Sequence, residues 1–163
     1  MVATVLIREK NGAGETATDK TSGTIRFKNA DNATVDSNNP MVVPGAGTDY
    51  SYIKYIRVKL DTPASDKISN IVAYTDGAKA WSAGVSLSWK TTTSYTTPAE
   101  ETSIASYTSA FTYTSGSPLT IGAGPYSATG DVGNYLMMVL TVDSTVQPGI
   151  LSSETMTIAY DEI

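Results

Sequence analysis

The sequence predicts an all-β protein: a single antiparallel β-sandwich, jelly-roll-like, with about eight strands joined by long loops or arms. Three observations lead to this prediction. Apolar residues alternate with Thr, Ser or charged residues in about eight separate segments, as expected of strands with one buried and one wet face. Gly, Pro and Asn separate these segments and mark turns. No segment longer than about ten residues combines helical spacing, an N-cap and good helix formers.

The predicted strands follow one another along the whole chain. In the first, Val5 and Ile7 point to one side, whereas Thr4 and Arg8 point to the other. Later segments repeat this alternation, and the Asp-Gly pair at 76–77 suits a tight turn after the fourth strand. The predicted strands are residues 4–8, 24–28, 52–60, 68–75, 85–90, 111–114, 135–142 and 155–160.

Two segments depart from simple alternation. Residues 135–142 are apolar on both faces for most of their length, which predicts a central strand covered above and below, or one that faces a neighbouring subunit. In residues 98–106, Pro98 followed by Ala99, Glu100 and Glu101 resembles the first turn of a short helix, and a loop fits this segment equally well.

Four connections are long: residues 9–23, 29–50, 91–107 and 115–134. Connections of this length in a compact domain are functional, disordered or ordered by a partner. Their Gly and Pro residues mark places where the chain can extend as arms. No composition shift or fixed-period repeat divides the chain, so we expect one domain over residues 1–163.

Composition excludes several classes of partner and compartment. With a net charge of −5, the chain lacks the positive surface that nucleic acids and anionic membranes require. No stretch has the length of a membrane-spanning helix, and residues 1–8 lack the features of a signal peptide. The absence of Cys is typical of a protein made in the cytoplasm.

The chain lacks the residues that carry the commonest enzyme chemistry. It has no His and no Cys, which removes most proton transfer at neutral pH and all thiolate chemistry. Two carboxylates can catalyse hydrolysis without His, but the clustered acids of this chain are expected to solvate a β surface. These acids are Glu100, Glu101, Glu154, Asp161 and Glu162. We therefore expect no enzyme, no catalytic residue and no cofactor.

One loop is rich in oxygen ligands of the kind that Ca²⁺ prefers. Its spacing does not match an EF-hand, and Asn and Asp side chains also stabilise turns without an ion. The turn-rich loop is the favoured interpretation, and a bound cation is left open. The residues are Asn29, Asp31, Asn32, Asp36, Asn38 and Asn39.

The aromatic residues are mostly tyrosines: ten Tyr stand against two Trp and two Phe. Tyrosine tolerates half-exposed positions, so this composition fits a protein interface. It fits sugar stacking equally well, and packing at the edges of the sheets is a third interpretation. The aromatic content therefore does not decide between these functions.

Several short stretches resemble structural proteins of tailed-bacteriophage virions. They are residues 8–15, 24–31, 71–77, 147–149 and 153–162. The resemblance implies a β-sandwich component of the virion, made in the host cytoplasm, of the capsid decoration or cement type. Such a protein would bind the exterior of the major capsid protein lattice, and no catalytic residue is carried over. Two alternatives stay open: a carbohydrate-binding or host-adhesion module, and a tail-tube or tail-tip protein.

A decoration protein is expected to associate with itself as well as with the shell. Trimers match the quasi-three-fold positions of an icosahedral lattice, so a homotrimer is expected. The arms at 11–20 and 42–50 and the apolar strand at 135–142 are the candidate contact regions. The candidate interface residues are Asn11, Glu15, Lys20, Val42, Tyr50, Tyr52, Tyr135 and Met137.

Overall fold

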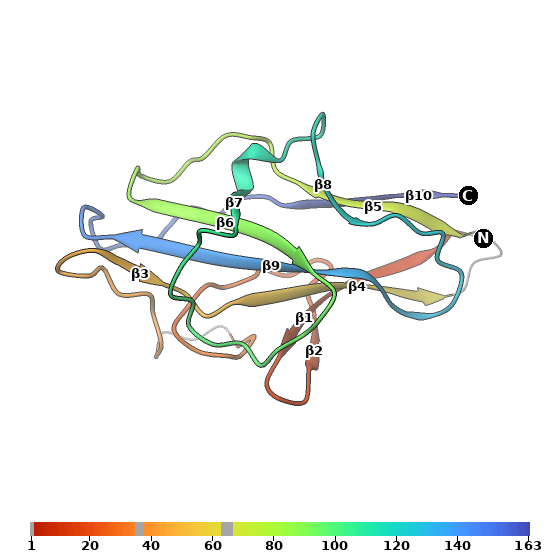
Figure 1. Ribbon diagram of the computed structural model, residues 1–163, viewed down its shortest axis with the longest axis horizontal. Helices are drawn as coiled ribbons and strands as arrows, with labels where there is room; N and C mark the ends of the chain where they lie inside the picture. Colours follow the sequence, from red (N-terminus) through yellow and green to blue (C-terminus); the bar gives the residue numbers. More distant parts are fainter. Residues whose placement is uncertain (1, 35–37, 63–66) are drawn as a thin grey trace.

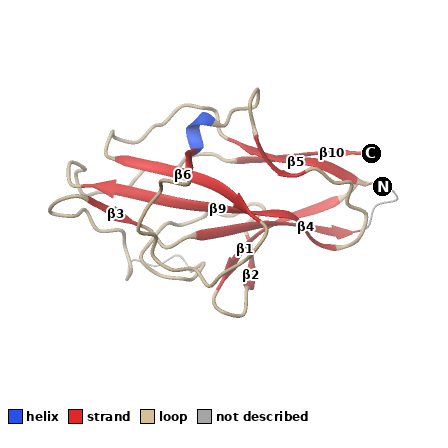
Figure 2. Ribbon diagram, in the orientation of Figure 1, coloured by secondary structure: helices blue, strands red, loops and turns tan. Residues whose placement is uncertain are grey.

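The computed structural model describes residues 2–34, 38–62 and 67–163. In these residues the chain forms two antiparallel sheets that pack against each other, consistent with a β-sandwich (Figures 1 and 2). The described residues form ten strands and one short 3-10 helix, η1 (Ala110–Thr112), and they contain no α-helix. The prediction of an all-β protein with antiparallel pairing is confirmed.

The larger sheet has seven strands, in the order β2-β1-β4-β9-β6-β7, and β3 also pairs with β9. The 14-residue strand β9 lies at its centre, between β4 on one side and β6 on the other. The bounds are β1 Thr4–Asn11, β2 Thr16–Asp19, β3 Thr48–Tyr50, β4 Lys54–Thr62, β6 Val85–Thr92, β7 Thr108–Ser109 and β9 Gly130–Asp143.

The smaller sheet has three strands, in the order β10-β5-β8. These are β5 (Ile68–Tyr74), β8 (Leu119–Gly122) and β10 (Thr157–Glu162). After β5 the chain turns at Gly77, where φ is +83° and the Asp76 carboxylate accepts a hydrogen bond from the Ala78 amide. The turn predicted at 76–77 is therefore present.

The core lies between the two sheets. Ile71 and Ala73 of β5 and Ile121 of β8 belong to the same cluster as Trp89 of β6 and Leu136 of β9, and all five are at most 1% exposed. Complete burial of a large apolar side chain contributes about 1.5–3 kcal/mol, so this cluster is the main source of stability.

β9 has the burial expected of a central strand, because every residue from Tyr135 to Val142 is buried. Leu136, Met138, Leu140 and Val142 join the core between the sheets. On the opposite face, Tyr135 and Met137 join a smaller apolar cluster with Tyr55. The chain itself thus covers both faces of this strand, as predicted.

Two predicted strands are not strands. Residues 24–28 belong to no strand, although Ile25 and Phe27 pack against the core as their alternation predicts. Residues 111–114 overlap η1 instead, because the chain turns there to place Phe111 against Trp81 and Tyr113 against Trp89.

Other segments also differ from prediction. The short strands β2, β3, β7 and β8 were not predicted, and β2 lies inside the expected loop 9–23. Residues 98–106 contain no helix. Residues 99–101 instead pair with residues 51–53, because Ala99 accepts a hydrogen bond from the Ile53 amide and Glu101 donates one to the Ser51 carbonyl. Residues 105–106 form a turn.

Candidate functional site

The two sheets differ in length, and this leaves part of the larger sheet without a partner sheet. β9 has 14 residues, whereas β5 has 7 and β10 has 6. In Figure 1 the smaller sheet lies near the chain termini, while β3 and the end of β9 lie at the opposite end of the molecule. At that end, segments at 20–28, 40–43 and 146–156 that belong to no strand cover the inner face.

These covering segments leave a cavity of about 1030 Å³ beside the sheet, and this cavity is partly open to solvent. The lining includes side chains from the inner face of β6 and β9 that are themselves at most 5% exposed: Val85, Leu87, Trp89, Met138, Leu140 and Val142. Phe27, Met41, Val43 and Met156 line the opposite side. The chain has two Trp residues, Trp81 and Trp89, and both line the cavity. The cavity is therefore mainly apolar and aromatic.

Exposed aliphatic side chains lie at the edge of this cavity. Val42, Ile150 and Leu151, which we call the apolar rim, line it and are 57%, 101% and 39% exposed. The other large apolar side chains exposed among the described residues, Val2 and Ile163, are at the chain ends. Grouped apolar exposure of this kind marks interaction surfaces more often than isolated exposed residues do.

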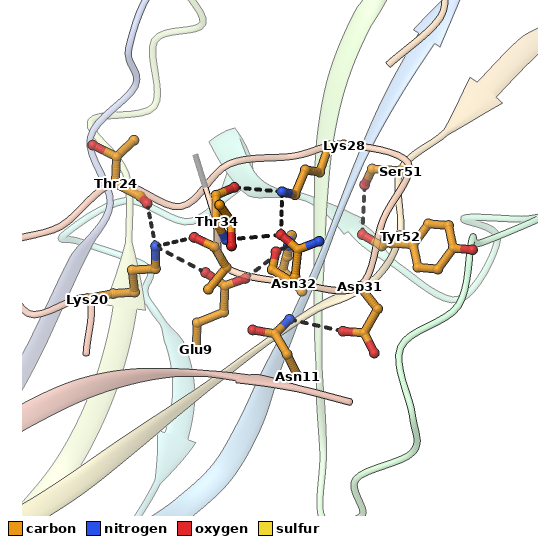
Figure 3. A network of polar contacts seen from close by, with 12 residues as sticks. Glu9, Asn11, Lys20, Thr24, Lys28, Asp31, Asn32, Thr34, Ser51 and Tyr52 are labelled. Carbon is orange, nitrogen blue, oxygen red and sulfur yellow. Dashed lines mark hydrogen bonds and ion pairs between the residues drawn. The ribbon is translucent and has the colours of Figure 1, made fainter. Parts of the chain in front are cut away.

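A buried polar network fixes one covering segment to the sheet (Figure 3). Lys54 and Glu9 are both fully buried, and the Lys54 ammonium donates to Glu9 Oε1 at 2.9 Å and to the Asn32 carbonyl at 2.9 Å. Lys20 lies 3.5 Å from Glu9 Oε2 and donates to the Thr24 carbonyl. The residue 20–34 arm is thus attached to the sheet through Lys20, which pairs with Glu9, and through the Asn32 carbonyl, which accepts from Lys54.

The same arm uses its oxygen atoms for internal contacts. Lys28 donates to Asn32 Oδ1 at 2.5 Å and to the Thr34 carbonyl at 2.6 Å. Asp31 accepts hydrogen bonds from the Asn11 side chain and the Gly12 amide. Asp36 lies outside the described residues. In the described part of the chain, no three acidic, His or Cys side chains gather into a metal-binding group.

A second cluster lies on the outer face of the larger sheet. The Tyr55 ring contacts Tyr95 and Tyr135 edge-on, with centroids 4.9 and 5.9 Å apart, and the Arg57 guanidinium lies 4.3 Å from the Tyr135 centroid. The hydroxyls of Tyr95 and Tyr135 donate to the Gly12 carbonyl and to Glu15 Oε1. This cluster joins the β1–β2 hairpin and the 93–107 loop to the sheet.

The tyrosines of this region remain neutral over a wide pH range. Burial, together with the hydrogen bond to Glu15, raises the pKa of Tyr135 to about 12. Burial also raises the pKa of Tyr95 and Tyr107 above the ordinary tyrosine value. These phenols act as hydrogen-bond donors and packing groups near neutral pH, so the arrangement supports a structural role.

Three of the clustered acids of the sequence each accept a hydrogen bond from a different partner. Glu101 accepts a hydrogen bond from Tyr107 at 2.7 Å, Glu154 accepts one from the Ala80 amide, and Asp161 accepts one from Asn70. Burial acts to raise the pKa of Glu101, but its hydrogen bonds from Tyr107 and from backbone amides outweigh this and lower it. No two of these three carboxylates share a hydrogen-bond partner among the described residues.

The eight candidate interface residues have different environments. Asn11, Tyr135 and Met137 are buried, and Glu15 and Lys20 are half-buried and occupied by the internal contacts described above. Tyr50 and Tyr52 are half-buried in and beside β3, and Val42 is exposed. The structure thus brings Glu15 and Tyr135 into contact and places Val42 elsewhere, on the apolar rim.

Ile150 and Leu151 were not singled out from the sequence. The sequence feature that could have identified them is a pair of consecutive aliphatic residues between Gly149 and Ser152. They belong to no alternating segment, so a search for strands passes over them.

Comparison with protein-family models, curated proteins and solved structures finds no match for this chain. Among the described residues, no helix has the length and apolarity to cross a membrane.

Proposed function

We propose that this chain is a non-enzymatic structural component of a tailed-bacteriophage particle: a capsid decoration or cement protein that associates with itself and binds the exterior of the shell. In this proposal it is made in the host cytoplasm and resides in the virion. Its partners are the major capsid protein lattice and further copies of itself, as a homotrimer, without nucleic acid or membrane.

The apolar rim carries the proposal. Ile150 is fully exposed and Val42 and Leu151 are partly so, on segments that are not held in a sheet. A contact built from uncharged side chains gains area and shape complementarity, and its strength accumulates when many copies bind one lattice. The resemblance of short stretches to virion proteins and the absence of His and Cys support the same conclusion.

The finer fold assignment, a jelly-roll connectivity, belongs to this proposal as well. The structure has two packed antiparallel sheets, which is a less specific description than a jelly roll. An experimental structure with two Greek keys across the sheets would support the finer assignment.

The adhesion alternative has less support. Stacking on a sugar needs a free aromatic face, but Trp89 is buried and stacks on Tyr113, while Trp81 contacts Phe111 and donates to the Ser152 carbonyl. Glycan-array binding that Trp81→Ala abolishes would favour this alternative over the proposal.

The proposal is tested with Ile150→Asp and a matched control, Val2→Asp. Both introduce one charge at an exposed aliphatic position, and Val2 is 78% exposed and does not line the cavity. We expect the parent chain and Val2→Asp to sediment as three chains of 17.2 kDa and to co-sediment with empty capsids of the virion. Ile150→Asp is expected to weaken both associations at least about tenfold, because it buries a charge at the contact.

Other outcomes would contradict the proposal. A parent chain that remains monomeric with and without capsids would overturn it. Binding to isolated tails but not to capsids would favour the tail alternative. An equal loss in both variants would show that the rim is not the contact.

A further inference from the structure

We infer that Arg8 and Arg57, side by side on the outer face of the larger sheet, form a binding site for an oxyanion, that is, a carboxylate or a phosphate group. Neither arginine lines the cavity or belongs to the apolar rim. The inference therefore does not depend on the proposed function.

The two arginines are direct neighbours across a strand pair. Arg8 of β1 and Arg57 of β4 are in register in the antiparallel ladder, so their side chains leave the sheet on the same face. Tyr135 of the outer-face cluster lies against Arg57, which shows that this face is the outer one. Like charges directly opposite each other destabilise a sheet, so the pair needs a negative partner.

Neither arginine has such a partner within the described part of the chain. No carboxylate there lies within ion-pair distance of either guanidinium, and no oxygen accepts a hydrogen bond from it. The Nε of Arg8 and the Nε and Nη1 of Arg57 are buried without an acceptor. The other three guanidinium nitrogens, Nη1 and Nη2 of Arg8 and Nη2 of Arg57, are not among these buried atoms, so they are the donors that a ligand can reach.

The neighbouring acidic side chains are bound to lysines. The Lys10 ammonium lies 3.3 Å from Glu15 Oε1 and 2.5 Å from Asp131 Oδ2. The Lys59 ammonium lies 2.5 Å from Asp61 Oδ1. These carboxylates therefore neutralise the lysines of this face and leave the arginines without a counter-ion.

Asp19 is the acid opposite Arg8 on the neighbouring strand β2. Its carboxylate accepts hydrogen bonds from the amide and the hydroxyl of Thr21, at 2.8 and 2.6 Å. These two bonds lower the pKa of Asp19 more than the charge of Arg8 does. One carboxylate that is held by Thr21 thus stands beside two arginines, which leaves an excess of positive charge.

The geometry of the donors favours an oxyanion over a halide ion. The Arg57 guanidinium carbon lies 4.3 Å from the centroid of the Tyr135 ring, whose hydroxyl is held by Glu15 at 2.6 Å. Arg57 is therefore fixed before a ligand arrives, which reduces the entropy that binding costs. The two Nη atoms of Arg8 form a fork that matches two oxygens of a carboxylate or phosphate, and Nη2 of Arg57 adds a further donor.

NMR of the full chain tests the inference directly, because the chain has only three arginines, Arg8, Arg26 and Arg57. Each arginine of the isotope-labelled protein gives one Nε–Hε signal, and Arg26 is exposed on a covering segment. The probes are sodium phosphate and sodium acetate, with the ionic strength held constant by sodium chloride. With at least one probe, we expect the Arg8 and Arg57 signals to shift saturably, with a dissociation constant in the millimolar range. The Arg26 signal is expected to show no saturable shift.

Lysine variants keep the charge and remove the fork. Arg8→Lys and Arg57→Lys are each expected to weaken binding about fivefold or more, and either one suffices if the other does not fold. Arg26→Lys is the matched control and is expected to bind like the parent chain. Thermal unfolding gives an independent measurement. The bound probe should raise the Tm of the parent chain and of Arg26→Lys above the value in chloride, and should raise it less in the two site variants.

Three results would overturn the inference. The first is no saturable shift with either probe. The second is a shift of the Arg26 signal equal to those of Arg8 and Arg57, which would indicate general screening of charge. The third is equal binding by the parent chain and by folded Arg8→Lys or Arg57→Lys. Saturation by only one of the probes would support the inference and identify the ligand class as phosphate or carboxylate.

Discussion

Glu9 and Lys54 show how a few buried charges determine the arrangement of a loop. Both are on the inner face of the larger sheet, beside apolar neighbours such as Ile7 and Ile56 in their own strands. From the sequence, Lys54 is a charged residue of a predicted strand and Glu9 begins the expected loop 9–23, so the pattern marks neither of them as buried. What fixes the 20–34 arm is the third partner, the Asn32 carbonyl, which only the fold brings to Lys54.

Replacing Lys54 with Met leaves Glu9 buried with only the more distant Lys20. Removal of one partner from a buried ion pair costs about 3–5 kcal/mol, so we expect the free energy of unfolding in urea to fall by this amount. Lys59→Met is the matched control. The Lys59–Asp61 pair is 30% and 38% exposed, and its loss is expected to cost under about 1 kcal/mol. Equal losses in the two variants would show that the buried pair has no special role.

Because the pKa of the Tyr135 hydroxyl is raised, we expect the folded chain to lose stability at high pH. Its pKa is raised from 10.0 to about 12 in the folded chain, so the folded state holds this proton more tightly than the unfolded state. Its contribution to stability is fully present below pH 10 and is lost as the pH rises through 12. Urea unfolding between pH 9 and 12 should show this loss, and Tyr135→Phe should show a smaller one. A pH profile unchanged by the substitution would contradict the assignment.

At the scale of elements, the apolar pattern of the sequence predicted the longer strands. β1, β4, β5, β6, β9 and β10 overlap predicted segments, and β9 was recognised because residues 135–142 are apolar on both faces. The strands β2, β3, β7 and β8 have only two to four residues each, too few for alternation to be visible. Residues 24–28 have the pattern of a strand without a neighbour to pair with, and pairing cannot be read from one segment alone.

The contact between the 93–107 loop and the β1–β2 hairpin gives a prediction at this scale. Tyr95→Phe removes the 2.7 Å hydrogen bond to the Gly12 carbonyl and keeps the ring beside Tyr55. We expect stability to fall by about 0.5–1.5 kcal/mol and amide hydrogen exchange at residues 12–16 to rise. Tyr52→Phe serves as the control, because the Tyr52 hydroxyl has no hydrogen bond among the described residues. Exchange that rises equally in both variants would contradict this contact.

For the molecule as a whole, a single domain over residues 1–163 remains a prediction, and it has a direct test. The core cluster contains residues of both sheets, such as Ile71 and Ile121 from one and Leu87 and Leu136 from the other. If one sheet unfolded alone, the apolar side chains of the other sheet would be exposed to water. We therefore expect both sheets to unfold in one cooperative transition. Denaturation curves from far-ultraviolet circular dichroism and from Trp fluorescence should coincide. Two separate transitions would contradict a single domain.

The candidate site was only partly predictable from the sequence. Val42 of the arm at 42–50 is exposed and lies on the apolar rim, whereas the role of this arm in an interface stays a prediction. Asn11, Tyr135 and Met137 are buried because the hairpin and the 93–107 loop fold back over them, and the sequence does not show which loops fold back. The cavity depends on the difference in length between the two sheets, which appears only when strands are assigned to sheets.

The two ends of the chain meet at one extremity of the molecule. The Ala3 amide donates to Glu162, and Lys67 and Ile163 exchange backbone hydrogen bonds, at the end of the sandwich away from β3 (Figure 1). A cargo protein or an affinity tag joined genetically to either end would therefore emerge on the side remote from Ile150. Such a fusion leaves the rim unobstructed, so the chain could carry a passenger protein while the proposed attachment face stays open.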